Sequence, residues 1–362
     1  MKSPNLVLAT MFPRSAYPGL AGLAAISIIA ALSATGTVVA ANGNDISSPN
    51  VKAPNIADYS TKCSYAKEVA SVDPILFHGV AQSPHLHQFF GADGITSTTT
   101  PADLRARTTN YCPVSVTDPA DPTKVLPDNS AYWFPALFTT LTKTTLVRPY
   151  YVLSYYRNAA IDPQTIQAFP QDLSMVAGDS HAVDPQPAHV AFNCVASSTD
   201  QTVPQPTIPL ACPVQNGAVP PKSYVLRLIV TFPDCLSSGA SLPNFTPWMM
   251  YSIDNPAYPA TSKWPKICPD GYPPIPQLDI GARWPMTSFP IVAGLYDLSQ
   301  ATLDSDLMVN QDGTITGGNG TTAHADFMSG WTDSQIADLI TNCYHVIPPI
   351  NCGAFGNGTG GA

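Results

Sequence analysis

Short segments rich in aromatic and β-branched residues recur along the chain, and stretches rich in proline and polar residues separate them. In residues 224–232, YVLRLIVTF, Tyr224 and every second residue after it are apolar, whereas the residues between them are mixed. Successive side chains of a β-strand point to opposite faces, so this alternation predicts a strand with one face in a core. Four further segments of similar composition are also predicted to be strands: 131–138, 149–156, 173–178 and 189–194.

Two other segments predict short helices. Thr100 precedes Pro101 in TPADLRAR, which is typical of a helix that begins with a capping residue followed by proline. In residues 332–343, TDSQIADLITNC, Thr332 and Gln335 form a capping-box pattern, and apolar residues follow at helical spacing. We expect this second helix to lie on a sheet.

Many strands and few helices favour an all-β fold. The simplest arrangement is a single, jelly-roll-like β-sandwich domain with long proline-rich loops, few short helices and disulfides. A division into two domains near residues 200–222 is the alternative. The expected boundaries are a signal peptide over 1–41, an N-terminal extension over 42–62, the sandwich domain over 63–345 and a glycine-rich tail over 346–362.

Residues 1–41 have the pattern of a secretory leader. Lys2 and Arg14 flank a short basic region, residues 19–39 are apolar and small, and small residues after Val38 offer a cleavage site. An uncleaved anchor is the rival interpretation, because the apolar run approaches the ~20 residues that span a bilayer. We expect cleavage, and therefore a secreted or cell-surface monomer that keeps no membrane span.

Composition narrows the classes of function. The chain has a net charge of −9 and 11% charged residues, with no cluster of lysine or arginine. Proteins bind nucleic acids through such clusters, so we expect no nucleic-acid partner. Glu68 is the single glutamate, which excludes a glycosidase built on two glutamates. Acid–base chemistry would have to use aspartate, histidine or tyrosine.

Eight cysteines lie between Cys63 and Cys352, and no C-x-x-C motif occurs among them. An even number of cysteines in an exported chain predicts disulfides rather than a thiolate metal site. We expect near neighbours in sequence to form three of the bridges: Cys194 with Cys212, Cys235 with Cys268, and Cys343 with Cys352.

Two histidines stand two positions apart in SPHLHQFFG, residues 83–91. On a β-strand, His85 and His87 would present their imidazoles on the same face. Such a pair could bind a metal ion, act as a base and its neighbour in proton transfer, or simply bond to loop backbone. The motif by itself leaves these three interpretations open.

A second pair with the same spacing, His324 and Asp326, occurs in AHADFMSGW. If this pair and the histidine pair converge, the four side chains form a candidate catalytic site or a site for a divalent metal. Aromatic residues such as Trp133 would then offer a surface on which a sugar ring can stack.

The ends of two predicted strands supply candidates for substrate binding. Tyr156 and Arg157 end one strand, and Asp179 follows another, two residues before His181. In a polysaccharide lyase, tyrosine or histidine removes the proton next to a uronate carboxylate, and arginine neutralises that carboxylate.

Several motifs follow one another in a fixed order between Cys63 and Cys343: DPILFHG, SPHLHQFFG, DNSAYWFPALF, FPQDLSMVAGD, FNC, FPDC, CPDGYPPIPQL and HADFMSGW. This order resembles the secreted family catalogued as domain of unknown function 1996, which is common in fungi, often beside carbohydrate-binding WSC modules, and also occurs in bacteria. The resemblance implies an extracellular, glycan-related role without a settled activity. It implies that the two polar pairs converge, and it adds Tyr132 and Trp133 to the substrate-binding candidates.

The chain departs from the family pattern at two places. After FPDC, the family usually has a tryptophan and then an acidic stretch of the form D-H-x-S-H, whereas this chain reads LSSGASLPNFTPWMMYS. Ser174 stands where an arginine is common. If the missing groups complete a site in the relatives, this protein would bind its ligand without turnover.

The sequence therefore predicts an exported protein that acts on, or binds, extracellular polysaccharide or another cell-envelope glycan. As an enzyme it would be a lyase or a hydrolase with a cleft of histidine and aspartate, namely His85, His87, His324 and Asp326. A divalent metal is compatible with the same side chains but is not required. The alternatives are a non-catalytic glycan-binding protein and a surface protein that sequesters metal.

Overall fold

The computed structural model describes residues 57–108, 112, 116–117, 125–214, 224–237, 249–254, 264–306, 308–309, 315–316, 318–349 and 352. Contacts group the chain into Met1–Ala41 and Asn42–Ala362, and every described residue belongs to the second unit. No helix within the described residues is long and apolar enough to cross a membrane.

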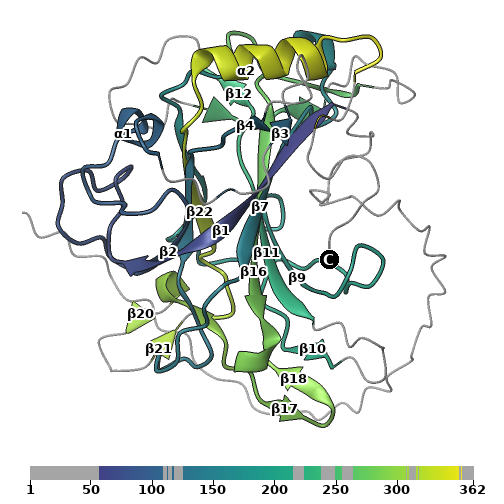
Figure 1. The fold of residues 1–362 in the computed structure, drawn as a ribbon. Coiled ribbons are helices and arrows are strands. Elements are labelled where there is room, and N and C mark those ends of the chain that lie inside the picture. The colour runs from purple at the N-terminus through teal and green to yellow at the C-terminus, as the bar shows by residue number, and fades with distance from the viewer. Residues whose placement is uncertain are drawn as a thin grey trace, which may run out of the picture. The chain divides into compact units, whose positions relative to one another are not determined.

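The described residues form a nine-stranded sheet, in which each strand is antiparallel to its neighbours (Figure 1). The five predicted strand segments all lie in it. The order across the sheet is β8 (Ser174–Gly178), β22 (His324–Met328), β5 (Ala131–Pro135), β2 (His87–Gly91), β1 (Asp58–Ala70), β7 (Tyr151–Arg157), β16 (Gln277–Pro285), β11 (Val225–Thr231) and β9 (Val190–Val195).

Strand β1 joins the two halves of this sheet. Residues 58–64 pair with β7, whereas Tyr65, Val69 and Ala70 pair with β2. The register shifts between Tyr65 and Val69, and such bulges bend a strand. At the far end, β8 also lies against β11. The two halves therefore enclose a common core, and the expected all-β sandwich is confirmed.

Alternate side chains of the strands enter this inner core. Leu226, Leu228 and Val230 of β11 face it, as the alternation predicts, and Phe134 of β5 packs near Trp284 of β16. A second apolar cluster lies on the outer face of β2, β5 and β22, where a loop and a short helix cover it. Its buried members are Ile75, Phe89, Ala92, Ile95, Leu104, Ala131, Trp133 and Met328.

Smaller elements complete the described fold. The short sheets are β10 (Ala211–Pro213) with β18 (Leu295–Asp297) and β17 (Ile291–Val292), β12 (Cys235–Leu236) with β13 (Met249–Met250), β14 (Ile253–Asp254) with β15 (Lys266–Ile267), β19 (Thr302–Leu303) with β6 (Leu137–Phe138), β20 (Met308–Val309) with β21 (Ile315–Thr316), and β3 (Val116–Thr117) with β4 (Val125–Leu126). The helical elements are α1 (Pro101–Arg105), α2 (Asp333–Leu339), the 3₁₀ turns η1 (Pro163–Thr165), η2 (Met286–Ser288) and η3 (Asp304–Asp306), and the π-helical turn η4 (Ile340–Tyr344).

Both predicted helices are present, with the predicted caps. The Thr100 side chain caps α1, and Thr332 with Gln335 forms a reciprocal capping box at the start of α2. Ile336 and Leu339 of α2 are buried in the inner core. The helix ends earlier than its apolar pattern suggested, because η4 continues it with a different hydrogen-bond pattern.

The three disulfides expected from the sequence are confirmed: Cys194–Cys212, Cys235–Cys268 and Cys343–Cys352. The fourth joins Cys63 on β1 to Cys112. No free cysteine occurs among the described residues.

The described sheet extends beyond the expected start of the domain at residue 63. β1 begins at Asp58, so residues 58–62 are part of the sheet rather than of an extension. Strands β9 and β11, on either side of residues 200–222, are neighbours in one sheet, which argues against a division there. Cys352, expected in the tail, is bonded to Cys343.

Candidate functional site

Three histidines meet on the outer face of β2, β5 and β22. Phe89 of β2 and Asp326 of β22 both pair with Trp133 of the central strand β5. His87 stands two residues before Phe89, and His324 stands two residues before Asp326. Each histidine therefore lies on the same face of its strand as the residue that follows it by two. The order of the strands therefore places these two imidazoles in one region, and the turn before β2 adds His85.

The three rings are in close contact. The Nε2 atoms of His85 and His324 are 3.0 Å apart. Ring centroids are 4.5 Å apart for His85 and His87, 4.9 Å for His85 and His324, and 5.8 Å for His87 and His324. One nitrogen of each ring can be chosen so that all three lie within 4.8 Å of one another. The sequence-based expectation of convergence therefore holds for the histidines.

Backbone carbonyls orient two of the rings. Nδ1 of His87 lies 3.0 Å from the carbonyl oxygen of Val72, and Nδ1 of His324 lies 2.9 Å from that of Thr322. A carbonyl oxygen only accepts hydrogen bonds, so each Nδ1 carries the proton and each Nε2 keeps a lone pair. Nε2 of His87 is buried and has no hydrogen-bond partner among the described residues.

Burial keeps the three imidazoles neutral. It lowers the pKa of His85 to about 4 and that of His324 to about 3, and it lowers the pKa of His87 well below its ordinary value. The other histidines lower the pKa values of His87 and His324 further. His87 and His324 are 0% and 3% exposed, whereas His85 is only half-buried, so His85 marks the side that solvent reaches.

Two aspartates hold the loops that carry these rings. Oδ2 of Asp304 accepts a hydrogen bond from the Leu86 backbone at 2.7 Å, and its Oδ1 lies 2.9 Å from Nζ of Lys143. Asp306 is buried and accepts bonds from the backbone and the hydroxyl of Thr322, at 3.1 and 2.8 Å. The sequence analysis did not identify either aspartate as part of the site. The signal that could have indicated them is the D-x-D spacing in LDSDL, shortly before His324.

Gly178 of β8 lets strand β22 approach at the site. Gly178 is the register partner of His324 and has φ +81°. A Cβ atom at this position would lie 2.4 Å from the carbonyl oxygen of Ala323 and 2.8 Å from Cα of His324. Glycine is therefore needed both for the backbone conformation and for the close contact.

Asp326 shares the outer face with His324, but its carboxylate is not among the atoms that converge within 4.8 Å. The side chain is buried, and neither oxygen has a hydrogen-bond partner among the described residues. Burial raises its pKa well above the ordinary value, and the nearby Asp73 raises it further. Nε1 of its strand neighbour Trp133 is likewise buried without a described partner.

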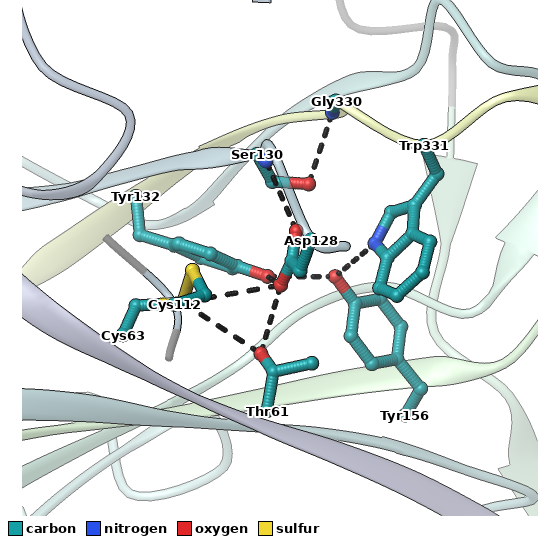
Figure 2. The surroundings of a disulfide bond; sticks show 9 residues. All are labelled: Thr61, Cys63, Cys112, Asp128, Ser130, Tyr132, Tyr156, Gly330 and Trp331. Carbon is teal, nitrogen blue, oxygen red and sulfur yellow. Dashed lines mark hydrogen bonds between the residues drawn. A yellow bond between two sulfur atoms is a disulfide. The ribbon is translucent and has the colours of Figure 1, made fainter. Parts of the chain in front are cut away.

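Tyr132 and Tyr156, expected to bind substrate, lie in the inner core (Figure 2). Their hydroxyls are 2.8 Å apart, and that of Tyr132 donates to Oδ2 of buried Asp128 at 2.7 Å. Nε1 of Trp331 lies 3.2 Å from the Tyr156 hydroxyl. A sugar could reach neither ring without opening the core. The network lies beside the Cys63–Cys112 disulfide, whose sulfur atoms are not available as metal ligands.

Arg157 and Asp179 lie apart from each other. Arg157 is buried on the other half of the sheet, where it pairs with Asp279 at 3.5 Å and lies 4.0 Å from Asp58. Asp179 is exposed in the loop after β8, and its Oδ1 accepts a bond from the His181 backbone at 2.8 Å. Of the substrate-binding candidates, Asp179 is thus the one near the exposed side of the histidines.

Three neutral imidazoles are the donor set of many transition-metal sites. Zn²⁺ binds three histidines and leaves a fourth position for water or substrate, and Cu²⁺ and Ni²⁺ also favour imidazole. Carbonyls that orient the second ring nitrogen are a usual feature of such ligands. The arrangement of His85, His87 and His324 fits this chemistry, and it also permits proton transfer across the 3.0 Å contact.

No curated protein and no solved structure matches the chain. A family model described as a domain of unknown function, DUF1996, matches residues 73–331, a range that contains all three histidines and both loop aspartates. The match covers more than half of the 362 residues. The chain therefore belongs to the family of the domain of unknown function DUF1996.

Proposed function

We propose that this protein binds a divalent transition metal ion through His85, His87 and His324. The observation that carries the proposal is that Nε2 of His87 is buried without a described partner, in a ring that lies beside two other imidazoles. A buried polar atom without a partner is costly, because it loses its hydrogen bonds to water. Coordination of a metal ion would satisfy it.

The donor set favours Zn²⁺ or Cu²⁺ over Mg²⁺ and Ca²⁺, which prefer oxygen ligands. With three protein ligands, the metal would keep a position for water or substrate on the side of half-exposed His85. Such a metal lowers the pKa of bound water and polarises a bound oxygen, which is the chemistry of metal-assisted hydrolysis.

The direct test is metal binding by the purified chain. After treatment with a chelator, the protein is titrated with Zn²⁺ and Cu²⁺ by calorimetry, and its metal content is measured after dialysis. We expect one ion per chain for the wild type and loss of binding in a His85→Ala/His87→Ala double variant. His78→Ala is the matched control, since His78 lies in the same connection and bonds to the Pro74 carbonyl outside the cluster. If the double variant bound Zn²⁺ and Cu²⁺ as well as the wild type does, the proposal would be wrong.

The same site is our candidate for action on extracellular polysaccharide. The half-exposed edge at His85 lies near groups that bind hydroxyls or carboxylates, because Asp304 accepts a bond from the Leu86 backbone and pairs with Lys143. Four disulfides among the described residues are typical of exported proteins, which supports a secreted or cell-surface location.

Cleavage would be assayed with a panel of neutral and uronate polysaccharides. Reducing ends report a hydrolase, absorbance of unsaturated uronate reports a lyase, and a chelator reports the need for metal. Retention on one polysaccharide without cleavage would favour a glycan-binding protein. Metal binding with neither cleavage nor retention would favour metal sequestration.

A further inference from the structure

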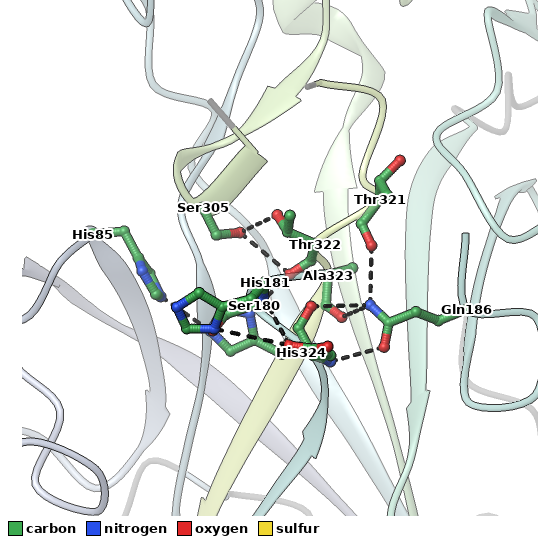
Figure 3. A network of polar contacts seen from close by, with 10 residues as sticks. His85, Ser180, His181, Gln186, Ser305, Thr321, Thr322, Ala323 and His324 are labelled. Atoms are coloured by element: carbon green, nitrogen blue, oxygen red, sulfur yellow. Dashed lines mark hydrogen bonds and ion pairs between the residues drawn. The ribbon is translucent and has the colours of Figure 1, made fainter. Parts of the chain in front are cut away.

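A fourth histidine, His181, lies near His85 and His324 (Figure 3). β8 ends at Gly178, the register partner of His324, and the loop that follows carries His181. The side chain is 92% exposed and therefore has room to turn.

The loop that carries His181 is tied to the strand that carries His324. Nε2 of Gln186 lies 2.9 Å from the carbonyl oxygen of Thr321 and 3.2 Å from that of Ala323, the residue before His324. Oε1 of the same side chain accepts a bond from the Asp179 backbone at 2.7 Å (Figure 3). These contacts fix the backbone near His181 relative to the centre, while its side chain is left to rotate.

The described contacts of the His181 ring involve Nδ1 and leave Nε2 available. Its Nδ1 lies 3.1 Å from the Ser180 hydroxyl and 3.8 Å from Oδ1 of Asp179. In the tautomer that donates from Nδ1 to the Ser180 hydroxyl, the lone pair is on Nε2, which is the arrangement seen in histidines that bind metal.

We propose that His181 is the fourth ligand of the metal centre, recruited from the surface when the ion binds. This inference rests on the proposed three-histidine site and states how many protein ligands the metal would have there. Four protein ligands make a closed site, whereas three leave a position for water or substrate. Because His181 is exposed and the other three rings are mostly buried, it is the ligand that can leave, so its release opens the centre.

The test uses the full chain loaded with Co²⁺, whose visible absorption depends on the number and kind of its ligands. The wild type is expected to show the strong absorption of a four-coordinate ion. His181→Ala should still bind Co²⁺ through the other histidines, with shifted absorption bands because water replaces an imidazole, and with an affinity on the order of 10–100-fold lower. Added imidazole should restore the absorption of this variant, which a merely structural role of His181 would not produce. Since the side chain is exposed, the variant should fold, and His78→Ala is the control.

Two outcomes distinguish the failures. Wild-type spectrum and affinity in His181→Ala would overturn the fourth-ligand assignment and leave the three-histidine site standing. Absence of Co²⁺ binding by the wild type, with Zn²⁺ and Cu²⁺ also unbound, would overturn both.

Discussion

The Nε2 atoms of His85 and His324 lie 3.0 Å apart, although 239 positions separate the two residues in sequence. The contact exists because β22 and β2 flank the same central strand, β5. It joins His324 to the histidine pair of SPHLHQFFG in one cluster, and the function proposed for the protein depends on it.

Binding of the metal should stabilise the fold. An ion that binds only the folded state, at a concentration 100 times its dissociation constant, raises the free energy of unfolding by about 3 kcal/mol. We expect this gain for Zn²⁺ or Cu²⁺ in thermal or urea unfolding of the wild type. His85→Ala should lose most of it, and His78→Ala should keep it. A gain of equal size in His85→Ala would mean that the ion binds elsewhere.

Alanine at Gly178 should damage the site through the backbone. Gly178→Ala and Gly294→Ala both place a Cβ at φ +81°, but nothing lies within 4 Å of the one at Gly294. Backbone strain of about 1 kcal/mol should be common to both variants. Only Gly178→Ala must also move Ala323 and His324, so we expect further destabilisation and at least a tenfold loss of metal affinity, by urea unfolding and calorimetry. Identical behaviour of the two variants would contradict the close packing of β8 on β22.

Removing one hydroxyl from the inner-core network should be costly. In Tyr132→Phe, Asp128 loses a 2.7 Å bond and the Tyr156 hydroxyl loses its 2.8 Å partner. Buried groups left without partners cost about 1–3 kcal/mol, so the free energy of unfolding should fall by that amount. Tyr150→Phe is the control, because Tyr150 is 52% exposed, and it should change stability little. Metal affinity should be retained in both variants, since neither residue belongs to the centre.

The stability of the protein should depend on pH through Asp58. Burial raises its pKa from 3.8 to about 6, with Arg157 acting in the opposite direction. The folded form therefore binds the proton more tightly than the unfolded chain, and this group contributes more stability as the pH falls through 6. Between pH 7.5 and 4.5 the effect amounts to about 2 kcal/mol.

The comparison that isolates this group is the wild type against Asp58→Asn in the presence of a chelator, because other groups also titrate. The free energy of unfolding of the wild type should rise relative to that of Asp58→Asn as the pH falls. Asp184→Asn, at an exposed position, should show no such relative change. A constant difference between the wild type and Asp58→Asn across this range would refute the assignment.

The local sequence was sufficient for the elements and for several of their details. Alternation of apolar residues predicted β11, and the capping box of Thr332 and Gln335 predicted the start of α2, because both patterns depend on residues a few positions apart. The nearest cysteines form three of the disulfides for a similar reason, since short loops are easily closed. His85 and His87 do lie together, but His85 is in the turn before β2 rather than on the strand that the spacing predicted.

Only the tertiary structure decided which faces of the strands point inward and which strands are neighbours. Tyr132 and Trp133 are both aromatic, so alternation put them on opposite faces without telling which one enters the inner core. The order β22, β5, β2 brings His324 to His85, and strand order depends on long-range packing that no local pattern encodes. The carbonyls of Val72 and Thr322 then orient two of the three rings of the proposed metal site.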